Sequence, residues 1–322
     1  MRNQNQKTKT NRSTTGYSIR ISSKVNQVDV RRSNVLLTDG RVIEVAVVGP
    51  KDGTPVVFHT GTPSSVFLFE PFMEAAEARG LRYVTYSRPG YGNSTRQADR
   101  TIADCASDTV QIANRLGLGR FFTIGWSGGG PHALACSAVL SDRVIAAASV
   151  AGIAPWDSPD LNYLAGMGEE NIEEFNAAIA GPNELRSYLE RAASSLAQVT
   201  GDQIIAALGG LVGNVDKRAL SGEFGTFLAE NTRAALKNGF WGWFDDDLAF
   251  VRNWEFDLAR IAVPVTVWQG AQDKMVPFSH GQWLAAHIPG VRAFLLPEHG
   301  HLSLAVDSFG RILDDLIASG KQ

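Results

Sequence analysis

The segment from Arg120 to Leu134 constrains the fold of this chain more than any other. It begins with an apolar run rich in β-forming residues and ends in an Ala- and Leu-rich run of helical character. Between them, Gly125, Ser127 and Gly129 form a G-x-S-x-G pattern, which is typical of a sharp turn from a strand into a helix. Glycine is favoured there because strand and helix come close together. The pattern predicts a strained turn that projects the Ser127 hydroxyl above the edge of a sheet, beside the free N–H groups of a helix start.

Short apolar runs alternate with helical patterns along the rest of the chain. Eight expected strands fall at residues 33–37, 42–48, 56–59, 82–86, 120–126, 144–150, 265–268 and 291–296. Their continuous apolar character is typical of parallel strands covered on both faces. Asp39-Gly40 is a hairpin signal between the first two runs, so we expect that pair to be antiparallel. The sequence therefore predicts the α/β class, with a mostly parallel eight-stranded sheet flanked by helices.

Two segments depart from this alternation. Residues 1–29 are rich in Asn, Gln, Ser, Thr, Lys and Arg and contain one acidic residue, Asp29. We expect them to form a disordered basic extension, with a targeting peptide as the alternative. Residues 154–257 carry mainly helical patterns and lie between the sixth and seventh strands. The sequence thus predicts a core of residues 30–153 and 258–322 and an inserted helical unit of residues 154–257.

Composition narrows the kinds of partner. The net charge of −3 argues against nucleic acid or an anionic membrane surface, so we expect a small molecule instead. No apolar run approaches the ~18 residues of a membrane-spanning helix. The two cysteines, Cys105 and Cys136, fall in expected helices and imply no disulfide framework. This cysteine usage fits a reducing cytoplasm.

Polar residues follow several of the expected strands, and functional groups gather at the carboxyl ends of parallel strands. Asp273 lies in the loop after the strand that ends at Trp268, and His299 and His301 lie between the last strand and the last helix. Alternatively, Asp273 only forms a turn, and His299 and His301 are surface residues of a loop. No cluster of other ligand residues accompanies the two histidines, so we expect no metal. We also expect no organic cofactor.

Ser127, Asp273 and His301 occur in the chain order Ser, Asp, His within a sheet of the expected type. In these features, residues 35–316 resemble the α/β-hydrolase superfamily of esterases, lipases and dehalogenases. The resemblance implies that Ser127 is the nucleophile and that His301, rather than His299, is the general base. It implies that Asp273 orients the imidazole and stabilises its charged form.

The resemblance also implies an oxyanion hole made by the backbone N–H groups of Thr62 and Gly128. Two positions depart from the usual family pattern. Thr60 stands where a histidine usually precedes the glycine, and Ser87 stands where the turn after the fourth strand usually begins with aspartate. A serine nucleophile argues against haloalkane dehalogenase and epoxide hydrolase chemistry, which needs a carboxylate nucleophile.

By the same resemblance, residues 154–257 form a helical cap over the active site, inserted after strand 6. From Pro155 to Asp257 the chain has 17 acidic and 7 basic residues, which disfavours an anionic substrate. The aromatic cluster at residues 240–244 is expected to pack between cap and core rather than against substrate. These features favour a serine hydrolase, of the carboxylic ester hydrolase kind, that cleaves a small neutral ester, lactone or amide through an acyl-serine intermediate.

Three alternatives stay open. A prolyl-type aminopeptidase would use the acidic cap to hold a substrate amine, although such enzymes usually carry Gly-Gly-Ser-Trp-Gly around the nucleophile. A cofactor-free perhydrolase would use the same three residues to make peracids. A non-catalytic protein of this fold would bind a small ligand under the cap, although the complete Ser, Asp and His set weighs against it.

Overall fold

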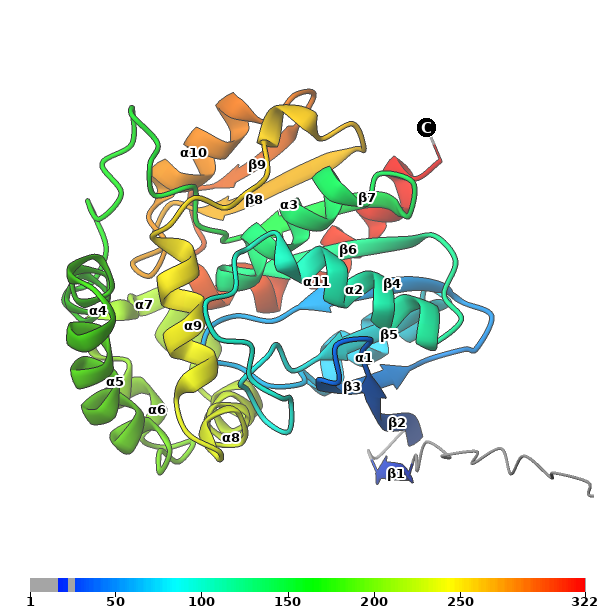
Figure 1. Ribbon diagram of the computed structural model, residues 1–322, viewed down its shortest axis with the longest axis horizontal. Coiled ribbons are helices and arrows are strands. Elements are labelled where there is room, and N and C mark those ends of the chain that lie inside the picture. The colour runs from blue at the N-terminus through cyan, green and yellow to red at the C-terminus, as the bar shows by residue number, and fades with distance from the viewer. Residues whose placement is uncertain (1–16, 23–26, 322) are drawn as a thin grey trace, which may run out of the picture.

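The computed structural model describes residues 17–22 and 27–321, which form one sheet with helices on both faces (Figure 1). The strands are β1 (Tyr17–Ser22), β2 (Gln27–Leu36), β3 (Val42–Val48), β4 (Thr54–His59), β5 (Leu81–Tyr86), β6 (Phe121–Trp126), β7 (Val144–Val150), β8 (Val265–Gly270) and β9 (Arg292–Leu296). Their order across the sheet is β1-β2-β3-β5-β4-β6-β7-β8-β9. Neighbours from β5 to β9 are parallel, whereas β1–β2, β2–β3 and β3–β5 are antiparallel. The predicted α/β class, mostly parallel sheet and antiparallel leading hairpin are confirmed.

Five helices cover the two faces of the sheet. They are α1 (Glu70–Glu77), α2 (Asp104–Arg115), α3 (Gly130–Val139), α10 (Phe278–His287) and α11 (His301–Ser319). Along β4, Phe58 joins a buried cluster with Phe72 of α1 and Phe309 of α11, whereas Val57 joins a cluster with Ile112 of α2. Successive side chains of one strand therefore enter opposite cores, which explains why the parallel strands read as unbroken apolar runs.

The N-terminal part of the chain differs from the prediction. We expected disorder throughout residues 1–29, but β1 pairs antiparallel with β2 and adds a ninth strand to the described sheet. The sequence of β1, YSIRIS, alternates β-forming and polar residues, which is a strand pattern. The prediction of disorder rests on the polar composition of the whole segment and does not take this short pattern into account. The rest of the predicted extension, residues 1–16 and 23–26, lies outside the described residues.

Between β7 and β8 the chain forms the inserted helices, here defined as α4–α9. They are α4 (Glu169–Ala180), α5 (Pro182–Leu196), α6 (Ile204–Ala207), α7 (Asn214–Leu220), α8 (Glu223–Leu236) and α9 (Trp241–Phe250). Figure 1 shows them gathered beside the core. They join it through aromatic contacts such as Phe69 with Phe224, whose ring centroids are 5.0 Å apart.

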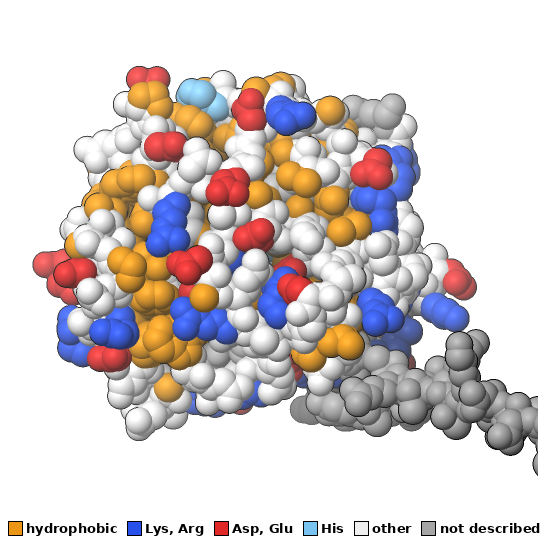
Figure 2. Space-filling model, in the orientation of Figure 1, with side chains coloured by type: hydrophobic (Ala, Val, Ile, Leu, Met, Phe, Trp, Pro, Cys, Tyr) orange, Lys and Arg blue, Asp and Glu red, His pale blue; other side chains and the backbone are white. Residues whose placement is uncertain are grey.

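The surface carries charges of both signs. On the face shown in Figure 2, acidic and basic side chains are interspersed, with apolar side chains between them. Among the helices described, none combines the length and the apolar character that a membrane crossing requires.

The stacked rings of Phe72 and Phe309 fix α1 against α11, with centroids 3.8 Å apart and ring planes 2° apart. Both side chains are buried. We expect Phe309→Ala to lower the free energy of unfolding by about 3–5 kcal/mol, because it leaves a cavity between the helices. Val139→Ala, at a position that is 53% exposed, serves as control and should change it by less than about 0.5 kcal/mol. Urea unfolding measures both, and equal effects would contradict this account of the core.

Candidate active site

Ser127 lies on the turn between β6 and α3. Its φ angle is +56°, in the left-handed region that non-glycine residues rarely adopt. The turn is this tight because the helix start presses against the neighbouring strand: a Cβ atom on Gly129 would overlap the carbonyl oxygen of His59. The residues on both sides of Ser127 are buried, whereas Ser127 itself is partly exposed and lines a cavity. The predicted strand–turn–helix geometry is therefore present around Ser127.

Asp273 and His301 lie together, although 28 positions separate them in the chain. Asp273 follows β8, and His301 is the first residue of α11. The Asp273 Oδ2 atom is 2.8 Å from Nδ1 of His301, and both side chains are buried. Asp273 Oδ1 accepts hydrogen bonds of 2.8 Å from the backbone N–H groups of Met275 and Val276. This arrangement makes Nδ1 of His301 the donor and leaves Nε2 as the basic nitrogen.

The environment of His301 favours its charged form. Burial alone lowers the pKa of an imidazole, but the carboxylates of Asp273 and Asp216 outweigh burial and raise the pKa of His301 above its ordinary value. A histidine with such neighbours can accept a proton and hold it while a reaction proceeds.

Asp216, in α7 of the inserted helices, is a residue that the sequence analysis did not single out. Its carboxylate accepts hydrogen bonds of 2.9–3.0 Å from the backbone N–H groups of His301, Leu302 and Ser303. These are free N–H groups at the start of α11, so Asp216 caps that helix from outside. A Cβ atom on Gly300 would overlap Asp216, which explains the glycine just before His301.

The other histidines have different surroundings. His299 lies near Asp307, with Nδ1 and Oδ2 3.8 Å apart, and is not placed against Asp273. His132, in α3, is buried and its Nδ1 donates to the carbonyl oxygen of Gly128 over 2.8 Å. Burial lowers the pKa of His132 to about 4, so its ring is neutral at ordinary pH.

Thr62 and Gly128, the two expected oxyanion residues, come into close contact. A Cβ atom on Gly128 would overlap the Thr62 hydroxyl, so this glycine lets the two segments approach. The Thr62 hydroxyl donates to Oδ2 of Asp246 over 2.8 Å and accepts from the guanidinium of Arg88 over 2.9 Å. The buried ion pair of Arg88 and Asp246 thus holds the loop after β4 in place.

That ion pair joins α9 of the inserted helices to the core. Arg88 donates to the carbonyl oxygens of Thr60 and Gly61, and its Nη2 is 2.6 Å from Oδ2 of Asp246. Asp246 also accepts from Arg100 over 2.7 Å and from the Tyr91 hydroxyl over 2.9 Å. Burial favours the neutral acid, but the two guanidinium groups outweigh it and hold the pKa of Asp246 well below its usual range. Sequence analysis missed this network because nothing local in the sequence joins these residues.

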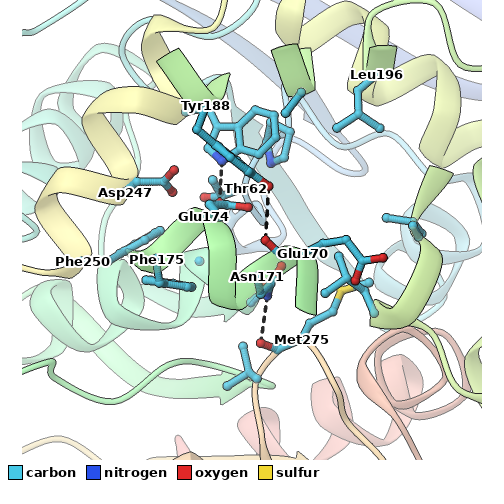
Figure 3. A pocket seen from close by; sticks show the side chains of 18 of the residues that line it. Thr62, Glu170, Asn171, Glu174, Phe175, Tyr188, Leu196, Asp247, Phe250 and Met275 are labelled. Atoms are coloured by element: carbon cyan, nitrogen blue, oxygen red, sulfur yellow. Dashed lines mark hydrogen bonds between the residues drawn. The ribbon is translucent and has the colours of Figure 1, made fainter. Parts of the chain in front are cut away.

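The cavity beside Ser127 has a volume of about 330 Å³. The core contributes Thr62, Gly128 and Ser127 to its wall, and the inserted helices contribute Glu174, Phe175, Tyr188, Trp243, Asp247 and Phe250 (Figure 3). A smaller adjoining cavity of about 80 Å³ is lined by Ser127, Thr62 and His301. Trp243, from the aromatic cluster expected to pack between cap and core, is buried in the packing and also faces the larger cavity.

One buried group of potential metal ligands lies in the described part of the chain, formed by His59, Cys105 and Cys136. Both nitrogens of His59 already have partners, the Tyr86 hydroxyl and the Thr123 hydroxyl, each at 2.9 Å. This group is therefore a hydrogen-bonded part of the buried core, and neither cysteine forms a disulfide bond.

The buried Asp246 ion pair should be worth much more than a surface pair. We expect Asp246→Ala to lower the free energy of unfolding by about 3–5 kcal/mol, because it leaves the buried Arg88 charged without its carboxylate and Arg100 with only the longer 3.8 Å contact to Asp245. Asp314→Ala removes the carboxylate of an exposed pair with Arg79 and should cost less than about 1 kcal/mol. Chemical denaturation of the two variants tests this, and similar losses would contradict it.

Known proteins are similar to this chain over most of its length. The sequence profile of the alpha/beta hydrolase fold family matches residues 54–308. The chain is 28% identical to a non-heme chloroperoxidase of Streptomyces lividans, over 76% of this chain and 83% of that protein. It is 27% identical to a putative carbamate hydrolase of Variovorax paradoxus, over 84% of this chain and 94% of that protein.

A solved structure of an alpha/beta hydrolase fold protein from Nakamurella multipartita superposes with a TM-score of 0.63 at 24% identity, over 90% of this chain and 99% of that one. At this identity the likeness concerns the fold. Together with the family match over most of the sequence, it shows that the chain belongs to the alpha/beta hydrolase fold family.

Proposed function

We propose that this protein is a serine hydrolase that cleaves a carboxylic ester, lactone or amide through an acyl intermediate on Ser127. The observation that carries the proposal is the buried Asp273–His301 pair beside a cavity that Ser127 and His301 both line. A base paired with an orienting acid and lining a cavity with a serine supports the roles of nucleophile, base and acid for Ser127, His301 and Asp273. Residues 154–257 would act as the cap that shapes the substrate cavity.

In the proposed first step, Nε2 of His301 takes the proton of the Ser127 hydroxyl as its oxygen attacks the substrate carbonyl carbon. The tetrahedral intermediate collapses, the bond to the leaving oxygen or nitrogen breaks, and His301 returns the proton to that atom. Water then attacks the acyl-Ser127 ester with His301 as the base, which releases the carboxylic acid and restores the serine.

The backbone N–H groups of Thr62 and Gly128 would stabilise the oxyanion. Such donors are effective only when they are fixed before the charge develops. The contacts of Arg88 with Gly61 and Thr62 hold this loop in the described structure, which supports Arg88 as a positioning residue. Asp246 would act in the same way through Arg88.

A second candidate is perhydrolysis, in which hydrogen peroxide replaces water. Its attack on acyl-Ser127 would release a peracid and restore the serine, with no change in the first step. The similarity to a protein named non-heme chloroperoxidase favours keeping this candidate. Product analysis with and without hydrogen peroxide separates water from peroxide as the acceptor.

Substitution of the nucleophile tests the proposal. A fluorophosphonate should label Ser127, and Ser127→Ala or His301→Ala should lower kcat for p-nitrophenyl butyrate by about 10⁴–10⁶-fold. Ser187→Ala, on an exposed part of α5, is the control and should retain labelling and turnover. Absence of an adduct, with turnover unchanged in both variants, would overturn the proposal and favour a ligand-binding role.

The raised pKa of His301 sets the pH dependence. Only the neutral ring can take a proton from Ser127, so activity should be lost as pH falls through a pKa above about 6.5, the ordinary value for histidine. Asp273→Asn removes the nearest carboxylate and should move the titration of His301 to lower pH, with a loss of about 10⁴-fold in kcat. The pH profile of kcat/KM measures the loss of activity at low pH, and histidine NMR signals measure the shift in the titration of His301. An unchanged titration in Asp273→Asn would contradict this assignment.

A further inference from the structure

The cavity beside Ser127 contains two carboxyl groups that face each other. Glu174 comes from α4 and Asp247 from α9, and Figure 3 shows the two carboxyl groups turned toward one another. Asp247 is 1% exposed, and no described N–H or O–H group donates to its Oδ2 atom. Glu174 Oε1 accepts from the indole N–H of Trp243 over 2.7 Å. Burial raises the pKa of both carboxyl groups, which favours a state in which one of the two holds a proton.

No positive charge balances this pair within the cavity wall. Among the described residues that line the cavity, none is Lys, Arg or His, and Glu170 adds a third carboxyl group. Its Oε2 atom is likewise buried and without a hydrogen-bond partner. Arg100, which interacts electrostatically with Asp247, donates its hydrogen bonds to Asp246 and to the carbonyl oxygen of Gly242 instead. Carboxylates that are buried without a counter-charge favour a ligand that supplies one.

A proton held by this pair can be displaced near neutral pH. Burial raises the pKa of Glu174 to about 7, and burial with the neighbouring charge of Glu174 raises the pKa of Asp247 well above its usual range. The titratable and charged groups that interact with the pair are Tyr163, Tyr188, Asp246 and Arg100, and Glu170 and Glu173 act on Tyr188 beside it. Only Arg100 in this set is cationic. A protonated amine that enters the cavity can therefore take the place of the proton and donate N–H groups to both carboxylates.

We propose that the Glu174–Asp247 pair is a subsite for an ammonium group, so that the substrate is an ester or amide bearing a primary or secondary amine. This inference rests on the proposed function, because it places the amine in the cavity that Ser127 lines. The aromatic rings of Trp243 and Phe250 in the same wall suit a cation and its alkyl chain. The substrate class differs from the neutral ester that the sequence favours, and the cavity volume of about 330 Å³ keeps it small.

Matched substrates test the subsite. Methyl ω-aminoalkanoates of increasing length are each paired with the methyl alkanoate in which CH₃ replaces NH₃⁺. At the chain length that places the ammonium group at the Glu174–Asp247 pair, kcat/KM of the wild type should be about 10–100-fold higher for the amino ester than for its methyl counterpart. The ratio should fall to near one in Asp247→Asn and stay at the wild-type value in Glu173→Gln, an exposed position on α4, the helix that carries Glu174. A ratio near one in the wild type, or an unchanged ratio in Asp247→Asn, would overturn the inference.

Calorimetry tests the subsite without turnover. Hexylammonium should bind the wild type with release of a proton, more tightly as pH rises through about 7, and should bind Asp247→Asn at least about tenfold more weakly. Equal affinity for hexanol would overturn the ammonium subsite. If Asp247→Asn is not folded by thermal melting, Glu174→Gln replaces it in both assays. Labelling of Ser127 reports separately on the proposed function. If Ser127 is labelled but the enzyme shows no preference for the amino ester, only the ammonium subsite is rejected. If Ser127 is not labelled, the proposed function fails, and calorimetry alone decides whether the subsite binds an ammonium group.

Discussion

The buried carboxylate of Asp246 is the interaction on which the arrangement of this site depends most. It comes from α9, after the chain has left the sheet for about 90 residues, and it neutralises Arg88 and Arg100 inside the core. Arg88 in turn holds the carbonyl oxygens of the loop that carries Thr62. A buried guanidinium without its carboxylate is costly, so the folding of the insertion and the shape of this loop are energetically coupled.

A second carboxylate from the insertion supports the opposite side of the site. Asp216 holds the first backbone N–H groups of α11 and thereby fixes the position of His301. The core alone supplies Ser127, Asp273 and His301, but the insertion determines where two of the surrounding segments lie. The inserted helices therefore belong to the same cooperative structure as the core, in addition to forming one wall of the cavity.

Sequence patterns predict the parts of this structure that depend on local rules. Ser127, Asp273 and His301 are identifiable because each follows a strand, and parallel strands bring their ends to one edge. The partners Asp216 and Asp246 are not identifiable from the sequence. Each lies on a helix, and the spacing of apolar residues along a helix shows which face is buried but not which residues that face contacts. Glu174 and Asp247 belong to the same class: their acidity is visible in the sequence, and their pairing depends on how α4 packs against α9.

The cap on α11 has a consequence for how a small molecule reaches the cavity. If α7 swung outward, the backbone N–H groups that Asp216 now satisfies would lose their partner, and an outward swing of α9 would uncover Arg88. A hinged opening of the entire insertion is therefore expensive. The helix α5 is held differently: its Leu185 and Leu189 pack by apolar contact, which has no directional requirement, beside a hydrogen bond from the Tyr188 hydroxyl to the carbonyl oxygen of Glu170. A sliding displacement of α5 would leave the contacts of Asp216 and Asp246 intact, so a small molecule could enter the cavity on the α5 side while the segments around Ser127 and His301 stay in place.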